Sequence, residues 1–183
     1  LIFKLLAVLL ILFPPNSSAN KLSCNMTEVD KYIDIKYIKF IDISTPKSKK
    51  WAKNYFNALW DDKEILKKYK KKFNANIRVL FDNDIECNFP AKIRITGDGK
   101  DHLSSAPLVT SLDVKLLKGN IDSVIRFKLF IPRTRNGDNE IISTALLKEL
   151  GFLAPKTYYV ASTFNGQSVT YIFQEKIAKE FLE

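Results

Sequence analysis

Two β-rich runs enclose an Asn-Gly pair in the stretch Lys156-Thr-Tyr-Tyr-Val-Ala-Ser-Thr-Phe-Asn-Gly-Gln-Ser-Val-Thr-Tyr-Ile-Phe173. Both runs are rich in β-branched and aromatic residues, which favour strands. Asn165 and Gly166 tolerate the positive φ angles that a two-residue hairpin turn requires. The stretch therefore predicts an antiparallel hairpin that joins strands at residues 156–164 and 167–173.

Similar strand patterns extend from this hairpin toward the N-terminus. β-Branched, aromatic and alternating apolar residues form several further runs, and short polar segments separate them. Asp82-Asn83-Asp84 separates two of these runs, which we expect to form a second hairpin. The further predicted strands cover residues 33–43, 75–81, 85–96, 111–117 and 124–131.

Apolar residues recur every three or four positions in two segments, which predicts helices at residues 48–60 and 139–150. Gly151 follows the second segment, at a position where a left-handed residue commonly ends a helix. Another helix is predicted to begin at Asp61. Its acidic first turn and its lysine-rich last turn both suit the helix dipole. A last helix is expected from Ile177 onward. Mostly antiparallel strands with packed helices are typical of the α+β class.

An apolar run at residues 5–13 follows Lys4 and precedes a small-residue segment that ends at Ala19. The run is shorter than the ~20 residues that a membrane-spanning helix needs. This arrangement is typical of a secretory signal peptide at residues 1–19 and predicts export to the periplasm, cell envelope or extracellular space. An uncleaved membrane anchor at residues 1–13 is the alternative. In an oxidising compartment, Cys24 and Cys87 could pair.

The chain is strongly basic, with a formal net charge of +9. Ten lysines and three carboxylates lie between Ser44 and Phe73, so a local excess of +7 is concentrated there. Such an excess favours contact with an acidic polysaccharide or an anionic membrane surface. A solvated helix face is the simpler explanation. Aromatic residues are not interleaved with these cations as on base-stacking surfaces, so no nucleic acid partner is expected.

A polar loop follows the strand that contains Arg94. It holds Asp98, Asp101 and His102, which place two carboxylates near an imidazole. These groups can serve in acid–base chemistry, but Asp side chains also commonly hold turns by bonding backbone amides. His102 is the only histidine of the chain, so no multi-histidine metal site is predicted.

Two further clusters carry cations that suit an anionic ligand. Lys115 lies on a predicted strand, on the face opposite its apolar residues, where the amine can hold a phosphate or point to solvent. Arg133 and Arg135 precede the helix that contains Glu140. Guanidinium groups bind carboxylates and phosphates in a fork-like geometry. Arg94, Arg133 and Arg135 are therefore candidate anion ligands.

A series of short motifs follows in order between about Phe89 and Phe181. They are Pro90-Ala-Lys-Ile-Arg-Ile-Thr-Gly-Asp98 with Asp101-His102, Leu112 to Leu116, Arg126-Phe-Lys-Leu129 with Pro132, Thr134-Arg-Asn136, Leu146-Leu-Lys-Glu-Leu-Gly151, Ala154-Pro-Lys156, Asn165-Gly166 and Gln174-Glu-Lys176. In order and spacing, this part of the chain resembles the N-terminal part of the spore-coat protein H (CotH) kinase family. It is most similar to the secreted members found beside polysaccharide genes.

The resemblance implies a protein-kinase-like fold in which residues 89–183 form the small N-terminal lobe, after a lysine-rich α/β region at residues 26–88. It implies nucleotide binding by Lys115, Glu140 and Glu175, with ATP and Mg²⁺ as cofactors of the full-length parent. That parent would transfer phosphate to a hydroxyl of a protein or glycan acceptor. The acidic catalytic residues of the family lie beyond the position of Glu175. The chain as given is therefore expected to be an inactive, truncated lobe.

A second hypothesis assigns the chain to another class of protein. In it, the chain is a non-catalytic cell-envelope protein that docks on acidic polysaccharide or lipid through its lysine-rich helices. Nucleotide binding that depends on Lys115 would favour the kinase lobe. Binding that collapses with salt, and that depends on the lysines between Lys67 and Lys72, would favour docking.

Overall fold

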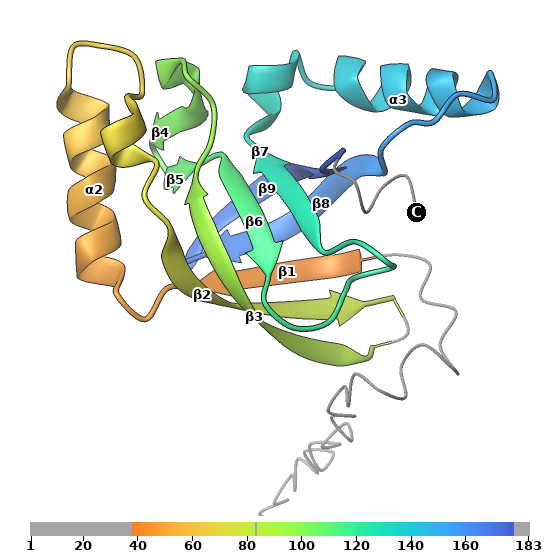
Figure 1. Ribbon diagram of the computed structural model, residues 1–183, viewed down its shortest axis with the longest axis horizontal. Helices are drawn as coiled ribbons and strands as arrows, with labels where there is room; N and C mark the ends of the chain where they lie inside the picture. Colours follow the sequence, from red (N-terminus) through yellow and green to blue (C-terminus); the bar gives the residue numbers. More distant parts are fainter. Residues whose placement is uncertain (1–37, 83, 178–183) are drawn as a thin grey trace, which may run out of the picture.

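The computed structural model describes residues 38–82 and 84–177 (Figure 1). Seven strands form a closed barrel in the order β1-β2-β3-β6-β7-β9-β8, and β4 pairs separately with β5. The described elements are β1 Ile38–Ser44, α2 Ser48–Trp60, η1 Lys67–Tyr69, β2 Phe73–Phe81, β3 Glu86–Ile95, η2 Lys100–His102, β4 Leu103–Ser105, β5 Leu108–Thr110, β6 Leu112–Leu116, β7 Arg126–Phe130, η3 Pro132–Arg135, α3 Asn139–Glu149, β8 Thr157–Phe164 and β9 Gln167–Glu175.

Alternating residues fill the interior of the barrel. In β2 and β3, nearly every second residue is buried, so one face of each strand turns inward and the other outward. Aliphatic and aromatic side chains pack the interior, where the rings of Phe127 and Phe173 stack with their centroids 4.7 Å apart. The outward positions of the same strands carry the polar and charged side chains.

The barrel closes through a parallel pairing of β1 with β8, in which residues 40–43 lie opposite residues 161–164. The turn of the β8–β9 hairpin supports this closure. The Asn165 side-chain oxygen accepts hydrogen bonds from the backbone amide and the hydroxyl of Thr45, at 2.8 and 3.1 Å. The backbone amide of Asn165 donates to the Ile43 carbonyl at 2.8 Å. The predicted turn therefore also holds the two ends of the sheet together.

The expected α+β fold, a kinase-like lobe with packed helices, is wrong. The described chain is mostly sheet, closed into a barrel, with two α-helices. The two predicted hairpins are confirmed, because β2 pairs with β3 and β8 with β9. The closing contact joins residues 120 positions apart, and no local pattern specifies such a pairing. The expected boundary between residues 26–88 and 89–183 falls inside β3, and the barrel takes strands from both sides of it.

The helix α2 packs against one side of the barrel (Figure 1). It buries Trp51, Tyr55 and Ala58, whose helical spacing places them on one face. The Trp51 ring meets Phe73 and Phe164 edge-on, with centroid distances of 5.0 and 5.2 Å. These contacts fix α2 beside the first residues of β2.

The Lys100 ammonium group holds the C-terminal end of α2. Its Nζ donates to the carbonyl oxygen of Ala58, to that of Leu59 at 3.3 Å and to that of Asp61 at 2.5 Å. Carbonyls in the last turn of a helix lack partners within the helix, and a cation there also interacts favourably with the helix dipole. Lys100 thus ties α2 to the loop before β4.

Replacing Lys100 by methionine should lower the free energy of unfolding by about 2 kcal/mol, because at least two partly buried carbonyls lose a charged donor. Urea unfolding measures the loss, and hydrogen exchange should show faster opening at the end of α2. Lys63→Met is the control, since Lys63 is exposed, and it should change stability by no more than about 0.5 kcal/mol. Equal effects of the two variants would contradict the assignment.

The prediction that a helix begins at Asp61 is wrong. Only the single 3-10 turn η1 forms there, and β2 follows at Phe73. The Asp61 carboxylate accepts a hydrogen bond from the Tyr69 hydroxyl at 2.7 Å and lies 3.1 Å from the Lys68 ammonium, which folds the segment back. A helix would also place lysines of this run four residues apart, and such like-charge pairs destabilise helices.

The helix α3 forms where the sequence predicts it, and Gly151 follows its end with a φ of 81°. It lies near the ends of β7, β8 and β9, apart from α2 (Figure 1). Its apolar residues do not face the core, however. Ile142 and Leu146 on the helix and Leu150 directly after it are 61, 57 and 62 % exposed. The spacing predicts the helix correctly but not its surroundings.

The predicted signal peptide or anchor and the helix expected beyond Ile177 lie outside the described residues. Cys24 lies outside them too, whereas Cys87 on β3 is disulfide-bonded. Within residues 38–82 and 84–177, no helix combines the length and the apolar character needed to cross a bilayer.

Candidate polyanion-binding site

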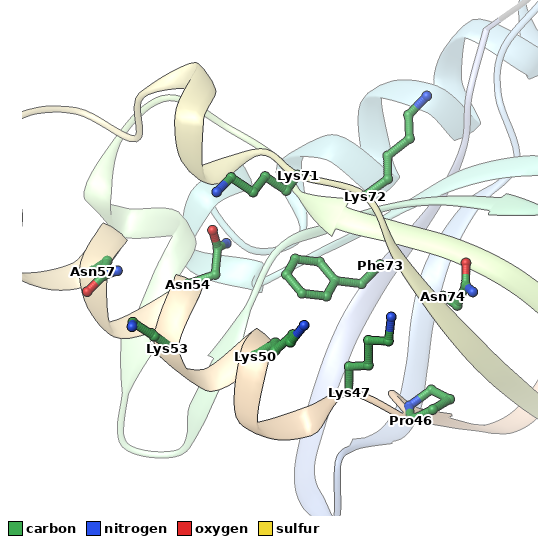
Figure 2. Close-up of a pocket in the computed structure, with 10 residues that line it drawn as sticks. All are labelled: Pro46, Lys47, Lys50, Lys53, Asn54, Asn57, Lys71, Lys72, Phe73 and Asn74. Carbon is green, nitrogen blue, oxygen red and sulfur yellow. The ribbon is translucent and has the colours of Figure 1, made fainter.

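A basic hollow, here called the lysine groove, lies between α2 and the segment that leads into β2 (Figure 2). Its volume of about 470 Å³ is within the usual range of ligand pockets. The groove is lined by Pro46, Lys47, Lys50, Lys53, Asn54, Asn57, Lys71, Lys72, Phe73 and Asn74.

Five of these lining residues are lysines, and none is a carboxylate. Lys50 and Lys53 lie about one turn apart on α2, Lys47 directly precedes the helix, and all three line the groove. Lys71 lies across the groove from them, and Lys72 follows it with its ammonium group directed away from α2 (Figure 2). The helical period and the packing of α2 beside β2 therefore bring two lysine clusters together across one groove.

The floor of the lysine groove differs from its walls. Phe73 lies between the two sets of lysines, where its ring is partly buried against Trp51 (Figure 2). Asn54, Asn57 and Asn74 add amide groups, and the Asn54 amide donates to the Tyr69 carbonyl at 2.7 Å. The groove thus combines an apolar surface, amide groups and ammonium groups.

A second basic hollow, here called the strand groove, lies on the outer wall of the barrel over β3, β6 and β7. Its volume is about 330 Å³. Lys72 lines both grooves, so the two hollows adjoin on one basic surface. The strand groove is lined by Lys72, Lys92, Ile93, Arg94, Asp113, Lys115, Leu117, Arg126 and Lys176.

Asp113 sits among the cations of the strand groove. Arg94 donates to Asp113 Oδ2 from Nε at 3.0 Å and from Nη2 at 2.6 Å, and Lys176 donates to the same oxygen at 3.2 Å. Burial favours a higher pKa for this carboxyl, but the hydrogen bonds from Arg94 and Lys176 outweigh burial and hold the pKa below its usual value. Asp113 is therefore ionised near neutral pH and neutralises part of the groove.

The three candidate nucleotide ligands do not meet in one cleft. Lys115 lies on the outer face of β6, in the strand groove. Glu175 lies directly opposite the core residue Phe127 in the pairing of β7 with β9, so its side chain leaves the inner face of the barrel wall, away from Lys115. Its carboxylate accepts a hydrogen bond from the Lys156 backbone amide at 3.3 Å. Glu140, in the first turn of α3, accepts a hydrogen bond from the Gln174 amide.

The candidate anion ligands Arg133 and Arg135 are engaged in contacts within the protein. Arg133 donates to the Asp101 carbonyl at 3.0 Å and to the Leu103 carbonyl at 2.6 Å. The Arg135 guanidinium lies 3.9 Å above the ring of Phe130, a cation–π contact. Both side chains tie η3 to neighbouring parts of the fold.

The loop candidates Asp98, Asp101 and His102 lie close in sequence but share no hydrogen bond in the described structure. Lys70 forms an ion pair with Asp98 and holds the pKa of that carboxyl below its usual value. Burial lowers the pKa of the His102 imidazole, so the ring is neutral near pH 7. The same ring fills the space beside Gly97, where a Cβ atom would come within 2.0 Å of it.

Sequence reasoning missed Lys92, Arg126 and Lys176 as members of a basic site. Strand alternation could have placed Lys92 and Arg126 on outward faces, as it placed Lys115. Their meeting depends on the order and register of β3, β6 and β7, which the sequence pattern does not contain.

Comparisons with known proteins assign no family to the chain: no family model matches it, and no curated protein matches it significantly. The resemblance to the CotH kinase family therefore stays a prediction, as do its ATP and Mg²⁺. Among the described residues, no group of three or more His, Cys, Asp or Glu side chains could hold a metal ion.

Proposed function

We propose that this protein binds an acidic polysaccharide through the lysine groove, as a non-catalytic docking protein. The observation that carries the proposal is a groove with five lysines and no carboxylate among its lining residues. Cations gathered in a hollow concentrate positive potential and attract anionic ligands. The docking surface differs from the helix pair expected from the sequence, because one helix and one extended segment form it.

The shape of the groove favours a sugar polymer over a membrane. The lysines lie around a hollow rather than on a projecting surface, and a thin chain can enter a hollow that a flat bilayer only covers. Phe73 offers an apolar face to a sugar ring, and Asn57 and Asn74 offer amides to its hydroxyls. The ammonium groups suit the carboxylates of an acidic sugar.

The phosphotransferase hypothesis has less support. A closed barrel replaces the lobe that it requires, and Lys115, Glu140 and Glu175 lie apart. ATP-dependent phosphoryl transfer to a protein or glycan acceptor stays a prediction that we do not develop. Export, which the docking proposal also assumes, is predicted from residues 1–19 alone.

The test compares binding of the full chain and its variants to polygalacturonate. Lys50→Gln/Lys53→Gln should weaken binding at low ionic strength about tenfold, because each exposed charge contact contributes up to about 1 kcal/mol. Added salt should weaken wild-type binding and reduce this difference. Calorimetric titration measures both effects.

The matched control is Lys63→Gln/Lys67→Gln. It removes the same net charge from two exposed lysines that lie close in sequence but line neither groove. Its affinity should stay within about twofold of wild type. Equal losses in both variants would overturn the groove assignment. Tighter binding to phosphatidylglycerol vesicles or to duplex DNA than to polygalacturonate would overturn the choice of ligand.

A further inference from the structure

Three cationic side chains lie directly opposite one another across three adjacent strands of the barrel. Lys92 on β3 pairs with Lys115 on β6, and Lys115 pairs with Arg126 on β7. We call these residues the cation row. Directly opposite side chains share a face at about 5 Å between Cβ atoms, and like charges at such positions repel. The folded protein therefore holds three cations in an unfavourable arrangement that a bound anion would relieve.

The cation row lacks internal compensation. Within the described ranges, Lys92, Lys115 and Arg126 form no ion pair with a carboxylate, and the buried Arg126 Nε has no hydrogen-bond partner. The neighbouring row is different, because Asp113 lies between Arg94 and Lys128 on the same three strands. Asp113 thus offsets the repulsion between the cations of its own row, whereas the cation row contains no carboxylate.

We infer that the cation row binds successive sugars of an acidic polysaccharide that carries one carboxylate on every sugar, an inference that rests on the proposed function. Adjacent strands are spaced about 4.8 Å apart. This spacing is close to the length of one sugar in an extended glycan chain. A chain that crosses the strands therefore brings one carboxylate-bearing sugar past each cation.

Lys72 connects this site with the lysine groove, because it lines both hollows. A long polymer held in the lysine groove can continue over β3, β6 and β7. Its second contact is then intramolecular, which raises the affinity without further contacts at either site. Beyond the row, the Lys176 side chain also lines the strand groove, and the Lys176 backbone amide donates to the Arg126 carbonyl at 3.0 Å.

The spacing of its charges separates this ligand from other polyanions. Polyphosphate carries charges closer together than the strands, so it gains no match with the row. Hyaluronan carries a carboxylate on every second sugar and reaches only alternate cations. Polygalacturonate carries one on every sugar. Comparing these probes distinguishes recognition of spacing from attraction by charge alone.

The experiment titrates the full chain with the three probes at equal charge concentration. We expect wild type to bind polygalacturonate about tenfold more tightly than hyaluronan. Lys92→Gln/Lys115→Gln should abolish this preference, while Lys63→Gln/Lys148→Gln removes the same charge at exposed lysines outside both grooves and should keep it. Circular dichroism and thermal unfolding check that each variant is folded.

Each outcome supports or overturns the inference. A preference that survives Lys92→Gln/Lys115→Gln overturns the role of the cation row. Equal binding of polyphosphate and polygalacturonate overturns the match of spacing. If the Lys50→Gln/Lys53→Gln variant loses binding while Lys92→Gln/Lys115→Gln behaves as wild type, the proposed function stands and this inference fails. If neither pair affects binding, the proposed function itself fails.

Discussion

Replacing Asp113 by asparagine is expected to weaken the fold and to strengthen polyanion binding at once. Asp113 is 10 % exposed and accepts hydrogen bonds from Arg94 and Lys176. Because charged hydrogen bonds contribute roughly 1.5–3 kcal/mol, Asp113→Asn should lower the free energy of unfolding by about 2 kcal/mol. It also leaves the six cations of the strand groove without their described carboxylate, so affinity for polygalacturonate should rise roughly fivefold at low salt.

Opposite signs of the two effects distinguish this prediction from general damage to the fold. Urea unfolding gives the stability, and calorimetric titration gives the affinity. Asp122→Asn is the control, because Asp122 forms an exposed ion pair with Lys156 at 2.6 Å outside both grooves. It should change stability by less than about 1 kcal/mol and leave binding unchanged. Loss of both stability and affinity in Asp113→Asn would contradict the assigned role.

The stabilisation by Asp113 should also depend on pH. The folded-state pKa of its carboxyl lies below the unfolded value. Its stabilising contribution is therefore complete above the unfolded pKa of about 4, and it is lost as pH falls through the folded pKa. The difference in unfolding free energy between wild type and Asp113→Asn should shrink in that acidic range. A constant difference down to the lowest pH would contradict the ionised pairing.

Phe127→Ala should produce the largest loss of stability, about 4 kcal/mol. Phe127 is fully buried in the barrel and stacks on Phe173 with ring centroids 4.7 Å apart. Removing its ring takes away apolar burial and leaves a cavity, and close-packed cores relax only partly around such cavities. Urea unfolding measures the loss directly.

The control for this prediction is Ile142→Ala on α3. Ile142 is 61 % exposed, so its truncation should change stability by about 0.5 kcal/mol or less. Phe127 also lies next to Arg126 on β7, which carries part of the cation row. Phe127 itself points into the barrel and lines neither groove, so Phe127→Ala should reduce polyanion binding only where the barrel begins to unfold. A variant as stable as wild type would show that the barrel interior is not packed as described.

Local patterns determined most of the individual elements. The Asn165–Gly166 turn and the alternation around it predict the β8–β9 hairpin, and residues 75–96 predict β2 and β3 in the same way. The apolar spacing of residues 48–60 predicts α2, in which Trp51 and Tyr55 are buried. These features depend on residues close in sequence, whose conformational preferences act before any distant contact forms.

The tertiary structure decided the architecture and the site. The barrel closes because β1 meets β8, and the cation row exists because β3, β6 and β7 adopt one register. The α3 helix shows the same limit, since its spacing predicts an apolar face but not that Ile142 and Leu146 stay exposed. Strand order is set by the summed burial of distant side chains, whereas alternation within a strand only says which face each residue takes. The sequence by itself therefore determined a surplus of positive charge and the strands that carry it, and the register of the closed barrel decided where that charge gathers.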